Sequence, residues 1–186
     1  MADRATRGAA RLAAAVALPA ALVAGFIAYR VLSPSGTTHP AASASPGPQS
    51  SAPVAMPAPP LAERPATVCR ALLSRLPAAL RDRQRRPVTA GPEQNAAYGD
   101  PAITLACGAP RPSVNPVDIV YPLSGVCWYA VEGPAATTWT TVDREVPVAV
   151  TVPTGYSQPG QWVIEFSPAV GTAVPAGGNP PGGCKG

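Results

Sequence analysis

Residues 146–152 have the sequence Val-Pro-Val-Ala-Val-Thr-Val, with a valine at every second position. Alternate side chains of an extended chain point to the same face, so this spacing predicts a strand with one apolar side. Neighbouring stretches are apolar, alternating, or rich in β-branched and aromatic residues. The sequence therefore predicts strands at 102–107, 126–132, 137–142, 146–152 and 161–166. Residues 167–174 are expected to form a short final helix.

A helical period precedes these strands. The apolar residues that would share one helix face are Cys69, Leu72, Leu73, Leu76 and Leu80. Thr67 is the expected N-cap, and Pro77 is expected to kink or restart the helix. Together with the strands, this pattern predicts one α+β domain over residues 66–186, in which an N-terminal helix packs on a mostly antiparallel sheet.

A run of arginines follows the predicted helix: Arg81, Arg83, Arg85 and Arg86. We expect them to be solvated and to complement the negative end of the helix dipole, with contact to an anion or a lipid phosphate as the alternative. Residues 66–186 contain nine basic and eight acidic groups, so their net charge is only +1. Nucleic acid is therefore not an expected partner, because its binding domains concentrate positive charge.

The four cysteines of the chain are Cys69, Cys107, Cys127 and Cys184. An even number in an oxidising compartment predicts two disulfides, with three possible pairings. We favour Cys107 with Cys127, joining two strands, and Cys69 with Cys184, tying the tail to the helix. A zinc site is disfavoured because there is no C-x-x-C pair and the only histidine, His39, precedes the domain.

The N-terminus predicts a membrane anchor. Residues 12–29 carry no charge, and as a helix they would span about 27 Å, close to the bilayer core of about 30 Å. Three arginines precede this segment and only Arg30 follows it closely, which predicts that residues 1–11 are cytoplasmic. Residues 12–32 are then a transmembrane signal-anchor helix, and the rest of the chain lies outside. A cleaved signal and secretion are the alternative.

Residues 33–65 are rich in Pro, Ala and Ser and show no apolar periodicity. Such a stretch buries too little apolar surface to offset the entropy of ordering, so it is predicted to be a disordered, partly extended linker.

The predicted domain lacks most catalytic chemistry. It has no histidine and a single lysine, Lys185, which excludes Ser-His-Asp, Cys-His and most zinc mechanisms. Carboxylates remain, and a pair about 5–9.5 Å apart can hydrolyse a glycosidic bond. The candidate binding residues are Tyr98, Asp100 and Arg111, although an Asp before Pro more commonly starts a turn. No cofactor or metal is expected.

Several short strings occur in a recognisable order, from CRALL (69–73), LP (76–77) and RRPV (85–88) to YGDP (98–101), CGAPRP (107–112), SGVCW (124–128), WTTV (139–142) and FSPAV (166–170). They resemble an actinobacterial family of membrane-anchored or secreted proteins of unknown function, over about residues 66–174. That family has Asp where this chain has Cys127. The difference weakens the favoured disulfide pairing and argues against an essential catalytic role for that Asp.

The leading hypothesis is a single-pass membrane protein whose extracytoplasmic domain is not catalytic and binds an envelope protein or a wall polymer. The alternative is a carboxylate-based hydrolase of cell-envelope glycans. The two differ in one structural requirement, because the hydrolase needs two acidic side chains facing each other across a cleft.

Overall fold

The computed structural model describes residues 49–177 and 182–184, which belong to one unit, Pro46–Gly186. The predicted transmembrane segment, residues 12–32, lies outside the described residues, and so does the predicted linker up to residue 48. Within the described ranges, no helix has the length and hydropathy needed to cross a membrane.

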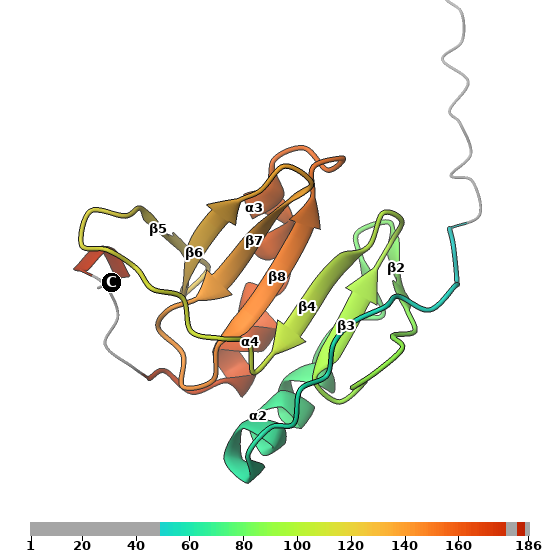
Figure 1. The fold of residues 1–186 in the computed structure, drawn as a ribbon, viewed down its shortest axis with the longest axis horizontal. Coiled ribbons are helices and arrows are strands. Elements are labelled where there is room, and N and C mark those ends of the chain that lie inside the picture. Colours follow the sequence, from blue (N-terminus) through green and yellow to red (C-terminus); the bar gives the residue numbers. More distant parts are fainter. Residues whose placement is uncertain (1–48, 178–181, 185–186) are drawn as a thin grey trace, which may run out of the picture. The chain divides into compact units, whose positions relative to one another are not determined.

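Eight strands form one sheet in the order β1-β2-β3-β4-β8-β7-β6-β5, and every neighbouring pair is antiparallel (Figure 1). The strands are β1 Ala79–Leu80, β2 Arg83–Arg86, β3 Asn95–Tyr98, β4 Ile103–Cys107, β5 Val120–Leu123, β6 Val126–Glu132, β7 Ala136–Thr141 and β8 Val148–Pro153. The last strand, β8, pairs with β4, so two strands that are far apart in the chain are neighbours at the centre of the sheet. The predicted strands 102–107, 126–132, 137–142 and 146–152 are confirmed as β4, β6, β7 and β8.

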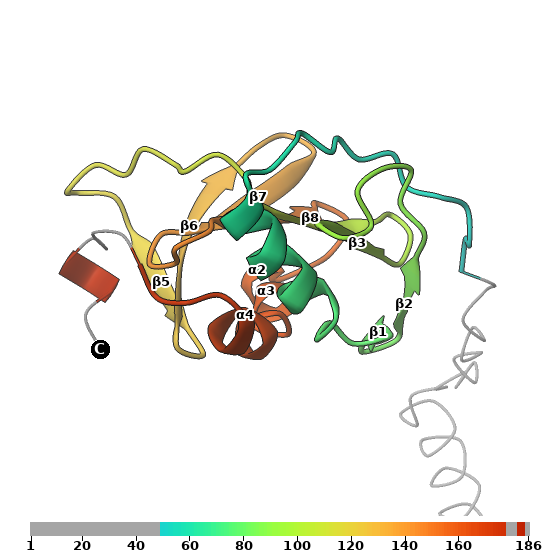
Figure 2. The same ribbon diagram turned by 90° about the horizontal axis from the view of Figure 1, so that it is seen from below.

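Helices cover one face of this sheet (Figure 2): α2 Glu63–Leu73, α3 Pro159–Val163 and α4 Ser167–Ala173. The valines of β8 at 148, 150 and 152 are at most 1% exposed, because they lie on the face that the helices cover. Burial of apolar side chains of this kind is the main favourable term in folding. The predicted α+β class, with a helix on an antiparallel sheet, is confirmed, and α4 is the predicted final helix.

Helix α2 begins and ends earlier than its apolar pattern suggested. Its N-cap residue is Ala62, and Thr67 lies inside the helix, where its hydroxyl donates to the Glu63 carbonyl at 3.0 Å. The predicted N-cap at Thr67 is therefore wrong. The helix ends at Leu73 because Leu76 precedes Pro77, and a residue before proline is disfavoured in helical conformation. The four clustered arginines consequently lie in the β1–β2 hairpin rather than at a helix end.

The predicted strand at 161–166 is also wrong, since Pro159–Val163 is helix α3. Proline is well suited to the first helical position, and here it starts the helix. Trp162 and Phe166 are four residues apart, a spacing that also fits one side of a helical turn, whereas Ile164 between them does not share that side. Both side chains are buried in the core.

Two disulfides are present as predicted, but their pairing is Cys69–Cys107 and Cys127–Cys184. The favoured Cys107–Cys127 bridge is wrong because β4 and β6 are separated by β8 and β7. Three strand spacings correspond to about 14 Å, beyond the reach of a disulfide. Helix α2 instead brings Cys69 to within 5.6 Å, Cα to Cα, of Cys107 at the end of β4.

Part of the predicted linker packs on the domain. Residues 49–62, here called the N-terminal strap, run to the start of α2 along the face of the sheet opposite the helices (Figure 2). Val54 forms a parallel bridge with Val88, and the buried Asn95 side chain donates to the Pro57 carbonyl at 2.9 Å. This part of the predicted spacer therefore contributes to the folded unit.

Candidate functional site

Tyr98 is a core residue. Its side chain is 0% exposed, and its ring meets that of Phe166 edge to face, with centroids 5.8 Å apart. The hydroxyl donates to the Pro77 carbonyl at 2.9 Å, and burial raises the pKa of the phenol. Tyr98 therefore joins β3 to the chain after α2 and offers no group to a ligand.

The other two candidate residues lie apart from it. Asp100 occupies the turn after β3, where its carboxylate is 3.6 Å from the Arg86 guanidinium. Arg111 follows the opposite end of β4 and donates to the carbonyls of Arg144 and Glu145 at 3.0 and 3.1 Å. The structure therefore does not bring Tyr98, Asp100 and Arg111 into one site.

The arginines of the β1–β2 hairpin are engaged by the protein itself. Arg81 donates to the Glu165 carboxylate at 3.0 Å and lies over the Trp162 ring, 4.8 Å from its centroid. Arg86, whose side chain is 10% exposed, donates to the Ala52 carbonyl of the strap. These contacts hold the hairpin to α3 and the strap to β2, so they account for two of the four arginines without an external anion.

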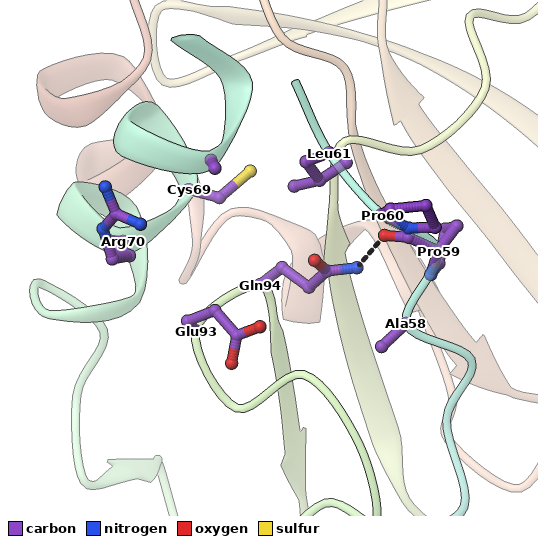
Figure 3. A pocket seen from close by; sticks show the side chains of 9 residues that line it. Ala58, Pro59, Pro60, Leu61, Cys69, Arg70, Glu93 and Gln94 are labelled. Atoms are coloured by element: carbon purple, nitrogen blue, oxygen red, sulfur yellow. Dashed lines mark hydrogen bonds between the residues drawn. The ribbon is translucent and has the colours of Figure 1, made fainter. Parts of the chain in front are cut away.

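A cavity of about 260 Å³ lies where the strap, helix α2 and the turn before β3 meet (Figure 3). Its lining residues are Ala58, Pro59, Pro60, Leu61, Ala66, Cys69, Arg70, Glu93 and Gln94. Figure 3 shows Cys69 and Arg70 on the helix side, the prolines and Leu61 on the strap side, and Glu93 and Gln94 on the turn. We call this the strap cavity.

The walls of the strap cavity are fixed by specific contacts. Gln94, only 5% exposed, donates from Nε2 to the Pro59 carbonyl at 3.2 Å. On the helix side, the disulfide to Cys107 fixes Cys69. Leu61 packs over Gly108, where an added Cβ would lie 2.5 Å from a Leu61 methyl carbon. The cavity is thus formed by the folded chain itself.

The charges that line the strap cavity have no charged partner among the residues that the structure describes. Arg70 donates to the hydroxyl of Thr67 at 3.2 Å. Among the described residues, neither Arg70 nor Glu93 takes part in an ion pair. By contrast, Arg64 at the start of α2 makes two 2.9 Å hydrogen bonds to Glu145. The cavity therefore presents one cation and one carboxylate that are both available to a ligand.

A second cavity, of about 330 Å³, lies beside the C-terminal tail and is lined by Pro122, Gly125, Val126, Cys127, Asp143 and Cys184. Asp143 pairs with Arg144 at 3.3 Å, and its other carboxylate oxygen is buried without a partner in the described part of the chain. Only residues 182–184 of the nearby tail are described after residue 177. The strap cavity, in contrast, is lined entirely by the continuously described stretch 58–94.

Neither cavity contains a pair of carboxylates, since each is lined by one: Glu93 in the strap cavity and Asp143 in the second. Within residues 49–177 and 182–184, no three His, Cys, Asp or Glu side chains are grouped to hold a metal ion. Neither cavity therefore brings together the two opposed carboxyl groups that acid–base hydrolysis of a glycosidic bond requires.

The strap cavity is not predicted by the sequence. Arg70 was part of a recognisable string but carried no functional prediction, and the strap prolines were assigned to the linker. The adjacent polar residues Gln94 and Asn95, directly before the apolar stretch of β3, were the only signal available. Their roles depend on the strap lying across the sheet, which the local sequence does not indicate.

A family model described as "Protein of unknown function (DUF3515)" matches residues 16–178. The chain belongs to this family. The match includes the whole sheet, helices α2 to α4 and the strap. No curated protein and no solved structure matches the chain. Because the family description assigns no activity, the function must be argued from the site itself.

Proposed function

We propose that this protein is a single-pass, actinobacterial-type membrane protein that presents a non-catalytic domain to the cell envelope, where the strap cavity binds an envelope protein or a wall polymer. The observation that carries the proposal is the strap cavity, with its fixed walls and two charges of opposite sign that form no ion pair with any described residue. The two disulfides indicate an oxidising, extracytoplasmic location for the domain.

The membrane topology rests on the sequence. Three arginines precede the apolar segment and one follows it closely, and this bias favours a cytoplasmic N-terminus. N-terminal sequencing of the protein purified from membranes tests the anchor against a cleaved signal. A start at Met1 or Ala2 agrees with an anchor, and a start beyond residue 32 would replace it with secretion.

Ligand binding is tested by filling the strap cavity. Ala66 lines the cavity from helix α2, so Ala66→Trp introduces a large side chain into it. Ala71→Trp is the matched control, because Ala71 is an exposed residue of the same helix. In crosslinked intact cells, the wild type and the control should recover the same envelope protein or wall material, and Ala66→Trp should lose most of it.

Two outcomes count against the proposal. Equal recovery with Ala66→Trp and the wild type would remove the strap cavity as the binding site. Failure of the wild type to recover any specific envelope component would remove the binding function itself. Circular dichroism of both variants checks that the fold is retained.

A further inference from the structure

The two opposite charges of the strap cavity, Arg70 and Glu93, point to the class of its ligand, on the assumption that the proposed function is correct. Arg70 extends from helix α2, and Glu93 belongs to the turn before β3 (Figure 3). Because the two side chains line one cavity without forming an ion pair, a ligand with a negative and a positive end can contact both. Each such contact is a charge-assisted hydrogen bond, which is stronger than a neutral one.

Gln94 adds a third polar contact to the lining of the strap cavity. Its amide nitrogen is used by the Pro59 carbonyl, which fixes the orientation of the side chain. No described residue donates a hydrogen bond to its amide oxygen, so Oε1 is available to accept one from a ligand. A dipeptide carries all three matching groups, namely a carboxylate, an ammonium group and an amide N–H.

The size of the strap cavity limits the ligand. Cavities that bind drug-sized molecules usually have volumes of about 300–1,000 Å³, and this one, at about 260 Å³, is slightly smaller. It suits an amino acid or the end of a peptide rather than an oligosaccharide. The apolar part of the lining, from Leu61, Pro60 and Ala66, suits a small aliphatic side chain.

We propose that the strap cavity binds a small zwitterionic ligand of the amino-acid or peptide-end class. The ligand carboxylate contacts Arg70, its ammonium group contacts Glu93, and a ligand N–H donates to Gln94 Oε1. A free peptide end is available from two sources in a cell envelope, namely wall peptides, which contain D-amino acids, and proteins, which contain L-amino acids. Both sources present the same charged groups, so only the stereochemistry of the ligand distinguishes them.

The test uses the full chain in detergent micelles and alanyl-alanine as the ligand, with binding followed by NMR titration at low salt. Wild-type protein should bind the zwitterionic dipeptide more tightly than its N-acetyl or C-amide forms. Both charged residues are exposed at the cavity rim, where single ion pairs contribute up to about 1 kcal/mol, so each blocking group should weaken binding about threefold to fivefold. The D,D and L,L isomers, titrated in parallel, identify the source.

Two substitutions assign each end of the ligand. With Arg70→Gln, amidation of the ligand carboxylate should no longer weaken binding, while N-acetylation still should. With Glu93→Gln the pattern should reverse. Arg75→Gln and Glu132→Gln remove exposed charges elsewhere and should leave both effects at their wild-type size.

The ligand class is overturned if the blocked dipeptides bind wild-type protein as tightly as the free one, or if no dipeptide binds at all. The proposed function would survive that result if Ala66→Trp still lost envelope material that Ala71→Trp recovered. If the crosslinking experiment failed as well, the strap cavity would have no role in binding, and both proposals would fall together.

Discussion

The two disulfides close loops of similar length but join very different parts of the molecule. Cys69–Cys107 spans 38 residues and links helix α2 to the end of β4, with both cysteines at most 2% exposed. Cys127–Cys184 spans 57 residues and links β6 to the short 3-10 helix Gly182–Cys184 in the tail, where Cys184 is partly exposed. The first bridge lies between packed elements, and the second attaches a tail.

Loop length alone does not distinguish them. The chain-entropy relation assigns about 4 kcal/mol to each loop, because its dependence on length is logarithmic. The difference must therefore come from the folded state. After loss of the first bridge, α2 and β4 still pack together, so the folded state gains little freedom. After loss of the second bridge, the tail is free to move in the folded state. This gain in entropy of the folded state offsets part of the stability that is lost with the bridge.

The largest expected effect is on the core bridge. Cys69→Ala combined with Cys107→Ala should lower the free energy of unfolding by about 5 kcal/mol, from the loop and from lost packing in the core. Such a loss is comparable with the whole stability of a small domain. Urea denaturation followed by tryptophan fluorescence measures it. A loss below about 2 kcal/mol would show that α2 and β4 are held together mainly by their other contacts.

The tail bridge should matter less. Cys127→Ala combined with Cys184→Ala should lower the free energy of unfolding by about 1–2 kcal/mol, because the freed tail regains entropy in the folded state. The same denaturation experiment measures the loss, and limited proteolysis should cut only after residue 174. If both double variants lost about 4 kcal/mol, loop length would be the sole determinant and the contrast between the bridges would disappear.

The same contrast explains which features the sequence could predict. The buried face of α2 and strands β4, β6, β7 and β8 follow from local periodicity, which depends only on neighbouring residues. The disulfide pairing depends on which strands are adjacent, and β4 lies beside β8, far away in the chain. No local pattern encodes that order, and so all three possible pairings remained open.

The sequence does not predict the strap cavity, for a related reason. Proline-rich residues 49–62 bury few apolar groups, and composition alone assigned them to the linker. Their attachment comes from polar side chains supplied by other elements, such as Arg86 and Asn95. Strands β1, β2, β3 and β5 are not predicted either; β2 consists of charged and polar residues, and β3 lacks alternation.

The strap tests the same contrast between packed and attached segments, because hydrogen bonds rather than a disulfide attach it to the sheet. Asn95 is 1% exposed and donates to the carbonyls of Pro57 and Ala90 at 2.9 and 3.1 Å. Asn95→Ala should lower the free energy of unfolding by about 1–2 kcal/mol, because the part-buried carbonyls of Pro57 and Ala90 lose their donor. Hydrogen exchange should show faster exchange of the Thr89 amide, which donates to Val54 of the strap, with the β4–β8 amides unchanged. If the Thr89 amide exchanges faster while the β8 amides do not, the strap has been released without global unfolding. Equal acceleration of exchange at both places would contradict this prediction.

The smallest expected effect concerns Arg64 and Glu145, which link the start of α2 to the loop before β8 by two hydrogen bonds of 2.9 Å. The bonds from Arg64 hold the pKa of the Glu145 carboxyl below its ordinary value. A carboxyl with a lowered pKa in the folded state stabilises the protein above its unfolded pKa, and this contribution is lost as the pH falls through the folded pKa.

Arg64→Gln should therefore lower the urea midpoint slightly at pH 7 and leave it unchanged at pH 2. Added salt should shrink the difference at pH 7, because both side chains are exposed to solvent. A difference that persisted at pH 2 would mean that Arg64 acts through packing on the domain, and the attachment at this end of α2 would then resemble the core bridge rather than the tail bridge.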